Sequence, residues 1–198
     1  MIILASASPR RKELLGTFIS SFEIMPADID ETPFEFEAPQ EYVVRVAKDK
    51  AFSIANITNN QTGNLIISSD TSVVVDGQIL GKPVDEADSK RMLRLLSNRS
   101  HEVITSLCVC DSQLRRVTTD IVVTQVEFRS ISDVEIALYW KSGEPKDKAG
   151  SYAIQGIGAS FVKSMAGSYS AVVGLPLFET ANRLAEFGVQ IFQEISDE

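Results

Sequence analysis

Cysteine and histidine are scarce in this 198-residue sequence, which contains two cysteines and one histidine. Cys108 and Cys110 are separated by one residue in an alternating segment, so both face the same side of a strand and a disulfide between them would be strained. A disulfide-stabilised scaffold is therefore excluded. His101 is the single imidazole, which leaves a zinc site at most three soft ligands and disfavours it. No G-x-S-x-G segment is present, which disfavours a serine-hydrolase triad as well.

Long apolar runs and an excess of positive charge are also lacking. No apolar segment reaches the roughly 18 residues of a membrane span. The amino-terminal segment MIILASASPRR places its apolar residues before its positive charges, which is the reverse of a secretory signal. The chain has 19 lysines and arginines and 27 aspartates and glutamates, which gives a net charge of -8. This balance disfavours a broad positively charged surface that would bind nucleic acid or anionic lipid. We expect a cytoplasmic protein with no nucleic-acid and no membrane partner.

The composition that is present is that of an ordinary folded protein, with 44% hydrophobic and 23% charged residues. The length suits one large domain. Proline and glycine are scattered singly, and no repeat or low-complexity tract divides the chain. The sequence therefore predicts a single domain over residues 1–198.

Strand and helix patterns interleave along the whole chain. Strands are expected at 1–5, 19–25, 65–75, 78–80, 101–110 and 115–128, with edge strands at 152–155 and 161–165. Helices are expected at 9–16, 39–56, 85–97, 132–143 and 176–188. The polar, glycine-rich segment 143–161 is expected to lie outside the core. Because two long strands form a central hairpin, the fold class is α/β (α+β), with a mixed β-sheet and flanking helices.

The first strand is followed by the turn SASPRR, which has the features of an anion-binding site. Ser8 is a helix N-cap with Pro9 at the first helical position, so backbone N–H groups and the positive end of the helix dipole are available there. Arg10 and Arg11 add guanidinium donors. The alternative is that Ser8 only caps the helix while both arginines are solvated. A Walker loop is excluded because GxxxxGK[ST] occurs nowhere.

Lys50 occupies an unusual position in the helix expected at 39–56. At 100° per residue it lies about 20° from Val43 and about 40° from Ile54, within the apolar stripe. A lysine that faces the core is rare. The alternative is that the aliphatic stem follows the stripe while the amine reaches water.

Carboxylates and further lysines gather in loops and at a strand end. A turn at Asp76-Gly77 returns the chain so that Lys82 comes near Asp70, where the alternative is a surface ion pair. Another loop carries two lysines at 146–148. The carboxylates that could hold a hard divalent cation are Asp28, Asp30, Glu31 and Asp70, and the alternative is that these acidic loops are solvated. Anion donors, carboxylates and lysines together predict an enzyme of phosphate chemistry, because a polyphosphate needs both fixed cations and a metal.

The sequence resembles the Maf family of nucleoside triphosphate pyrophosphatases almost from end to end. The matching blocks are ASASPRRKELL, the DE of Asp30-Glu31, AKDKA, SSDTSVV, GKP, MLRLLSNRSHEVIT, SGEPKDKAGSYAIQG and GSYSAVVGLPLFET. The resemblance implies two lobes around a deep cleft, a fold also like that of inosine triphosphatases. It also implies cleavage of a nucleoside triphosphate into a monophosphate and pyrophosphate with a divalent cation, Mg²⁺ or Mn²⁺. The block SGEPKDKAGSYAIQG resembles the branch that prefers dTTP and UTP, with modified pyrimidine nucleotides as further candidates.

The resemblance also implies roles for individual residues. Asp70 matches the general base that activates water, and Glu31 matches a carboxylate that holds the metal together with Asp70. The positions that match phosphate contacts are Ser8, Arg10, Arg11, Lys50 and Lys82. Arg10, Thr71 and Gln155 fall where members of the family differ in substrate.

Two other functions stay open at this point. Members of the family have been linked to inhibition of septum formation, so the cleft could instead belong to a nucleotide-sensing module that acts through a protein partner. A nucleotidyltransferase would need a second, acceptor substrate. A homodimer is expected only from the general frequency of two-fold assemblies.

Overall fold

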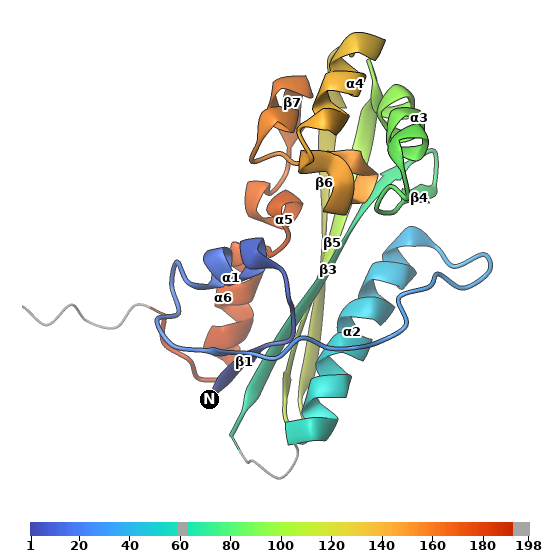
Figure 1. Ribbon diagram of the computed structural model, residues 1–198. Coiled ribbons are helices and arrows are strands. Elements are labelled where there is room, and N and C mark those ends of the chain that lie inside the picture. The colour runs from blue at the N-terminus through green and yellow to red at the C-terminus, as the bar shows by residue number, and fades with distance from the viewer. Residues whose placement is uncertain (59–62, 192–198) are drawn as a thin grey trace, which may run out of the picture.

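The computed structural model describes residues 1–58 and 63–191, which form one long twisted sheet with helices on both sides (Figure 1). The strands are β1 (Ile2–Leu4), β2 (Glu23–Ile24), β3 (Leu65–Val75), β4 (Gln78–Leu80), β5 (Ser100–Asp111), β6 (Val117–Phe128) and β7 (Val162–Ala166). The helices are α1 (Pro9–Leu15), α2 (Pro39–Thr58), α3 (Glu86–Leu96), α4 (Asp133–Lys141), α5 (Tyr169–Val173) and α6 (Leu177–Glu186). Three 3-10 turns follow α4, namely η1 (Glu144–Asp147), η2 (Ala149–Ser151) and η3 (Ile157–Phe161).

The sheet is mixed, as the sequence predicts. Its order is β2-β1-β3-β5-β6-β7, with β4 paired to β3. β1 runs parallel to β2 and β3, while β3, β5, β6 and β7 pair antiparallel. The long strands β3, β5 and β6 connect the two ends of the molecule. At one end α2 lies on one side of these strands and α1 and α6 on the other, and α3 and α4 surround the opposite end (Figure 1).

One edge of β3 is shared by two short strands that do not meet. β1 pairs with β3 as far as Leu4 opposite Ile67, and β4 pairs with it from Leu80 opposite Val73. Residues 68–72 of β3 therefore have no strand partner on that edge within the described part of the chain, although β5 pairs with them on the other edge. This interruption leaves an opening in the sheet edge.

Local signals account for the helix boundaries. Ser8 caps α1 by accepting the N–H of Arg11, with Pro9 at the first helical position. Ser132 and Glu135 form the reciprocal capping box at the start of α4. These features confirm the starts that the sequence predicts for both helices, while α4 ends at Lys141, before the predicted stop at Gly143.

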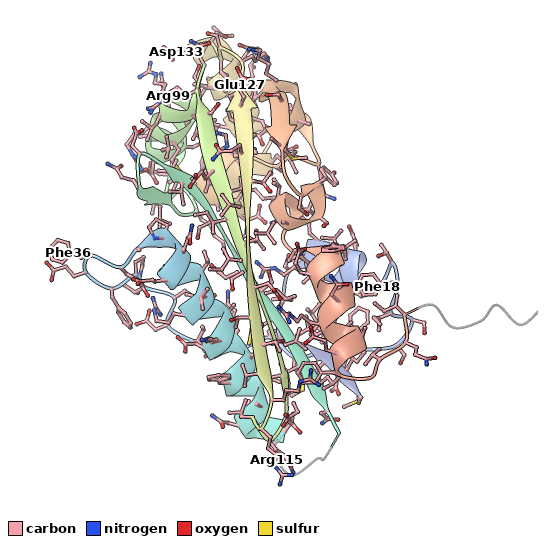
Figure 2. All side chains as sticks on the ribbon, turned by 180° about the vertical axis from the view of Figure 1, so that it is seen from behind. Phe18, Phe36, Arg99, Arg115, Glu127 and Asp133 are labelled. Atoms are coloured by element: carbon pink, nitrogen blue, oxygen red, sulfur yellow. The ribbon has the colours of Figure 1, made fainter. Side chains whose placement is uncertain are left out.

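The apolar side chains form packed clusters on both sides of the long strands. At the α3 and α4 end, Phe128, Tyr139, Tyr152 and Phe161 meet edge to face. Charged residues lie at the tips, with Arg99, Glu127 and Asp133 at one end of the molecule and Arg115 at the other (Figure 2). Within the described residues, no helix is both long and apolar enough to cross a membrane.

Two expectations about residues 143–161 are wrong. The stretch 152–155 is not a strand, because it lies between the 3-10 turns η2 and η3. The segment is also not outside the core, since Tyr152 and Phe161 are 5% and 2% exposed. Gly150 adopts a φ of 65° and approaches so closely that a Cβ there would lie 2.8 Å from the side chain of Val73. The turns satisfy many of their backbone polar groups locally, which lets a polar sequence pack inward.

Two short elements also differ from the sequence prediction. The strand expected at 19–25 is reduced to Glu23–Ile24, because only these residues pair with β1. The helix α5, capped by the Ser168 side chain, was not predicted. Five residues are too few for helical periodicity to be visible in a sequence.

His101 is enclosed by aromatic rings at the same end of the sheet. It is 2% exposed, its Nε2 lies 2.8 Å from the hydroxyl oxygen of Tyr152, and Phe128 packs against it edge to face. Burial lowers the pKa of His101 to about 4. The unfolded chain takes up this proton near pH 6.5, so it binds more protons than the folded chain between these two values. Neutral His101 therefore makes its full contribution to the unfolding free energy above about pH 6.5, and this contribution decreases as the pH is lowered toward 4.

A His101→Gln variant should be less sensitive to acid than the parent protein. Between about pH 7 and about pH 5, we expect the parent protein to lose about 1 to 2 kcal/mol more unfolding free energy than the variant, because glutamine does not titrate. Urea denaturation at the two pH values measures the difference. Equal losses in both proteins would contradict the assigned pKa direction.

Candidate active site

A cavity of about 540 Å³ opens at the interrupted edge of β3. It is bounded by the end of β1 and the start of α1, by α2, by the end of β4 and by the turns around η2. All the site residues that the family resemblance implies line it, namely Ser8, Arg10, Arg11, Glu31, Lys50, Asp70, Thr71, Lys82 and Gln155. Segments from most of the chain therefore meet at one place.

Lys50 faces this cavity between two carboxylates. Its Nζ lies 2.9 Å from Oδ1 of Asp70 and 3.0 Å from Oε1 of Glu31. Lys50 is 7% exposed, so the alternative in which its amine reaches water is wrong. Asp70 is also buried, whereas the side chain of Glu31 is about half exposed. The helical angle of Lys50 thus correctly predicts that this side chain faces inward, and the structure adds its two carboxylate partners.

The loop that carries Glu31 is attached to α2 by Tyr42. The hydroxyl of Tyr42 donates a hydrogen bond of 2.9 Å to the backbone carbonyl of Glu31. Burial and the charges of Asp70 and Glu31 raise the pKa of Tyr42 to about 12. The phenol therefore stays protonated at neutral pH and keeps its donor role.

Arg11 and Thr71 lie on the other face of β3 from Asp70. Arg11 donates from Nε to the Gly174 carbonyl at 2.8 Å and from its terminal nitrogens to the hydroxyls of Ser6 and Thr71. Burial lowers the pKa of Arg11, although the carboxylates of Asp70 and Glu31 act in the opposite direction. The alternative in which both arginines are solvated is therefore wrong for Arg11.

Ser8 and Arg10 occupy the entrance at the start of α1. The Ser8 hydroxyl accepts the N–H of Arg11 as the helix cap, while the Ser8 N–H donates to the Ser6 hydroxyl. The guanidinium of Arg10 has no side-chain partner within the described part of the chain, and Arg10 is half-buried at the cavity wall. Arg10 therefore leaves its donors available to an anion in the cavity.

Lys82 reaches the cavity but does not pair with Asp70. The β3–β4 ladder ends at Leu80, and the chain then leaves the strand at Gly81. Among the residues that the structure describes, Lys82 has no ion-pair partner, and it is exposed. The alternative of a surface ion pair is therefore not observed among these residues, and Lys82 lines the same cavity as Asp70 without a carboxylate partner.

Two of the predicted carboxylates lie outside the cavity, and one unpredicted carboxylate lies inside it. Asp28 and Asp30 are not among the lining residues, and Asp30 accepts the Thr32 N–H in a local turn. Asp147 lines the cavity and is ion-paired with its neighbour Lys148. Burial opposes ionisation of Asp147, but the hydrogen bond and charge of Lys148 lower its pKa overall. The only feature of the sequence that could have indicated a place for Asp147 in the site is its position between two lysines.

The pair Glu31 and Asp70 has the chemistry to hold a small divalent cation. No group of three or more His, Cys, Asp and Glu side chains gathers in a metal-binding arrangement within the described ranges. Mg²⁺, however, is usually bound through one or two carboxylates, with water and substrate phosphates as its other ligands. Glu31 and Asp70 already converge on one cation, the ammonium of Lys50, and so they fit this type of site.

Comparison with known proteins gives consistent matches over the whole chain. A family model described as a Maf-like protein matches residues 1–187. A dTTP/UTP pyrophosphatase of Hahella chejuensis is 47% identical over 193 residues, which are 98% of this chain and 95% of that protein. A dTTP/UTP pyrophosphatase of Shewanella oneidensis is also 47% identical, over 95% of this chain and 98% of its own. A solved nucleoside-triphosphatase from Mycobacterium abscessus is more distant, at 18% identity over 66% of this chain and 74% of its own, with a TM-score of 0.37.

Proposed function

The chain belongs to the Maf family, and we propose that it is a pyrophosphatase that hydrolyses dTTP and UTP to the monophosphate and pyrophosphate. One observation carries this proposal. A single cavity combines the paired carboxylates Glu31 and Asp70 with the unpaired cations of Arg10 and Lys82. Such a combination suits a polyanion whose hydrolysis requires a base.

We propose Asp70 as the general base. Its Oδ1 is held by Lys50, while its Oδ2 has no partner among the described residues and can accept a proton. In this mechanism Asp70 takes a proton from a water molecule, and the water oxygen forms a bond to the α phosphorus. The bond from that phosphorus to the oxygen bridging to the β phosphate then breaks, and pyrophosphate leaves.

The basic side chains are proposed to bind the triphosphate. Arg10 and Lys82 carry free charges, and Lys50 can exchange its carboxylate partners for phosphate oxygens. Ser8 and Arg11 border the same wall of the cavity. Fixed cations of this kind stabilise the charge that accumulates on a departing pyrophosphate.

We propose that Glu31 and Asp70 hold Mg²⁺ or Mn²⁺ with the substrate. When bound, such an ion supplies charge neutralisation at the phosphate oxygens. The half exposure of Glu31 allows it to move between Lys50 and the ion.

Thr71 and Gln155 are proposed to select the base together with Arg10. The hydroxyl of Thr71 is fixed by its neighbours, since Thr105 Oγ1 lies 3.0 Å away and Arg11 donates to it. Nucleotides that differ by one methyl or hydroxyl group differ in binding free energy by only about 1 to 3 kcal/mol in a shaped pocket.

Modified pyrimidine nucleotides are therefore candidate substrates beside dTTP and UTP. Removal of such nucleotides from the nucleotide pool is the proposed cellular role.

We further propose that the chain acts as one domain over residues 1–198, in the cytoplasm. The apolar clusters at its two ends share β3 and β5, which favours one folding unit. A homodimer is proposed only because closed two-fold assemblies are common.

Pyrophosphate release from a panel of nucleoside triphosphates tests the proposed function. We expect turnover of dTTP and UTP with Mg²⁺ or Mn²⁺, and none in the presence of a chelator. Turnover of purine nucleotides alone would discard the pyrimidine preference. Nucleotide binding without any turnover would favour the sensing module, and a requirement for an acceptor substrate would identify a nucleotidyltransferase.

A further inference from the structure

The carboxylate of Glu144 accepts hydrogen bonds from several groups in and around the turns after α4. Its Oε1 accepts the Tyr139 hydroxyl at 2.7 Å and the Gly158 N–H at 3.0 Å. Its Oε2 accepts the Ile157 N–H at 2.8 Å. Three donors, one from α4 and two from the start of η3, thus converge on one side chain.

Tyr139 extends this network to the other side of the same turn. Its hydroxyl oxygen accepts the N–H of Ala153 at 3.1 Å. Glu144 and Tyr139 therefore hold the backbone before and after Gln155. Gly156 passes so close that a Cβ would lie 2.1 Å from Oε2 of Glu144, so a larger residue at this position would displace the carboxylate.

Gln155 itself has no side-chain partner within the described part of the chain. It is exposed at the cavity wall, so its position depends on the backbone that carries it. A carboxamide has one donor and one acceptor side. It can match uracil or thymine, and the distance and angle of that match depend on where the turn places the side chain.

We propose that Glu144, acting with Tyr139, is a positioning residue for nucleotide selection, because it fixes the turn that presents Gln155 to the base. This inference rests on the proposed function, in which Gln155 contacts the base. Burial opposes ionisation of Glu144, but hydrogen bonds from Gly158, Tyr139 and Ile157 lower its pKa overall. The side chain is therefore a carboxylate at neutral pH and accepts all three bonds.

The variant Glu144→Gln tests this assignment. Glutamine retains one oxygen but turns an NH₂ group toward an N–H donor, so at least one of the three bonds is lost. We expect KM for dTTP to rise about tenfold with kcat within about twofold, because Asp70 and its chemistry lie on β3, outside the turn. The preference for dTTP over CTP in kcat/KM should fall by a similar factor.

Glu135→Gln is the matched control. Glu135 accepts the Ser132 N–H and hydroxyl and pairs with Arg129, at the opposite end of α4 from the turn. This variant should lower Tm while retaining the preference for dTTP. Tyr139→Phe should lower the preference, and its effect should combine less than additively with that of Glu144→Gln, because both residues belong to one network.

The possible outcomes separate this inference from the proposed function. A lower Tm in Glu144→Gln with an unchanged dTTP preference would overturn the inference, because the role would then be structural only. Binding of dTTP and CTP in chelator provides a measurement that needs no turnover. If the parent protein released no pyrophosphate but its binding preference still depended on Glu144, the pyrophosphatase proposal would fail and the assignment of Glu144 would stand.

Discussion

An Asp70→Asn protein is expected to bind nucleotide and to lose about 10²- to 10⁴-fold in kcat. Asparagine has the shape of aspartate and can still accept the 2.9 Å hydrogen bond from Lys50 through its oxygen. It cannot take a proton from water at neutral pH, so the basic step is lost, and its neutral amide also holds a divalent cation less tightly than a carboxylate does. Pyrophosphate release measures kcat, and calorimetric titration of dTTP in chelator measures binding separately.

The matched control for this variant is Asp30→Asn. Asp30 precedes Glu31 but lies outside the cavity, where it accepts the N–H of Thr32. The same chemical change at this position should leave turnover near that of the parent protein. Near-normal turnover in Asp70→Asn would refute the assignment of the base.

A Lys50→Met protein is expected to be both less stable and much less active. Methionine fills a similar volume but removes the charge that Asp70 and Glu31 share. Breaking a fully buried pair costs about 3 to 5 kcal/mol. Because Glu31 is half exposed and the pair lines a cavity, we expect a smaller loss of unfolding free energy, about 2 kcal/mol. The lost contact to phosphate should lower kcat/KM by about 10²-fold or more.

Urea denaturation and pyrophosphate release measure the two effects of Lys50→Met. Lys48→Met is the control, because Lys48 lies on the same helix but is not among the residues that line the cavity. It should change the unfolding free energy by less than about 0.5 kcal/mol. If Lys50→Met were as stable and active as Lys48→Met, the ion pairs of Lys50 would have no role in folding or catalysis.

The features that the sequence predicts well depend on local signals. The cap at Ser8, the box at Ser132 and Glu135 and the long central hairpin are each encoded within a few residues. The inward angle of Lys50 follows from helical periodicity alone, and the structure confirms that this side chain is buried. The resemblance then selects the remaining site positions, and all of them line one cavity.

The features that the sequence does not predict depend on contacts between distant segments. Asp147 enters the cavity only because the turns fold back against β3, where Gly150 meets Val73. Glu144 acquires its partners from Tyr139 and Gly158, which no periodicity connects. The opening on the β3 edge arises where the pairings of β1 and β4 end, and neither end is visible in the sequence of β3.

Adjacent residues on β3 serve opposite faces of the sheet. Asp70 meets Lys50 from α2, while Thr71 meets Arg11 from α1. If the two residues have the proposed roles, substitution of Thr71 should alter substrate choice while leaving the contact between Asp70 and Lys50 in place. This arrangement also makes the site sensitive to the register of β3. A single residue inserted in β3 before Asp70 would move each following side chain to the opposite face, and Asp70 would then point toward the side of Arg11. Single-residue insertions there should be far more damaging than any substitution at Thr71.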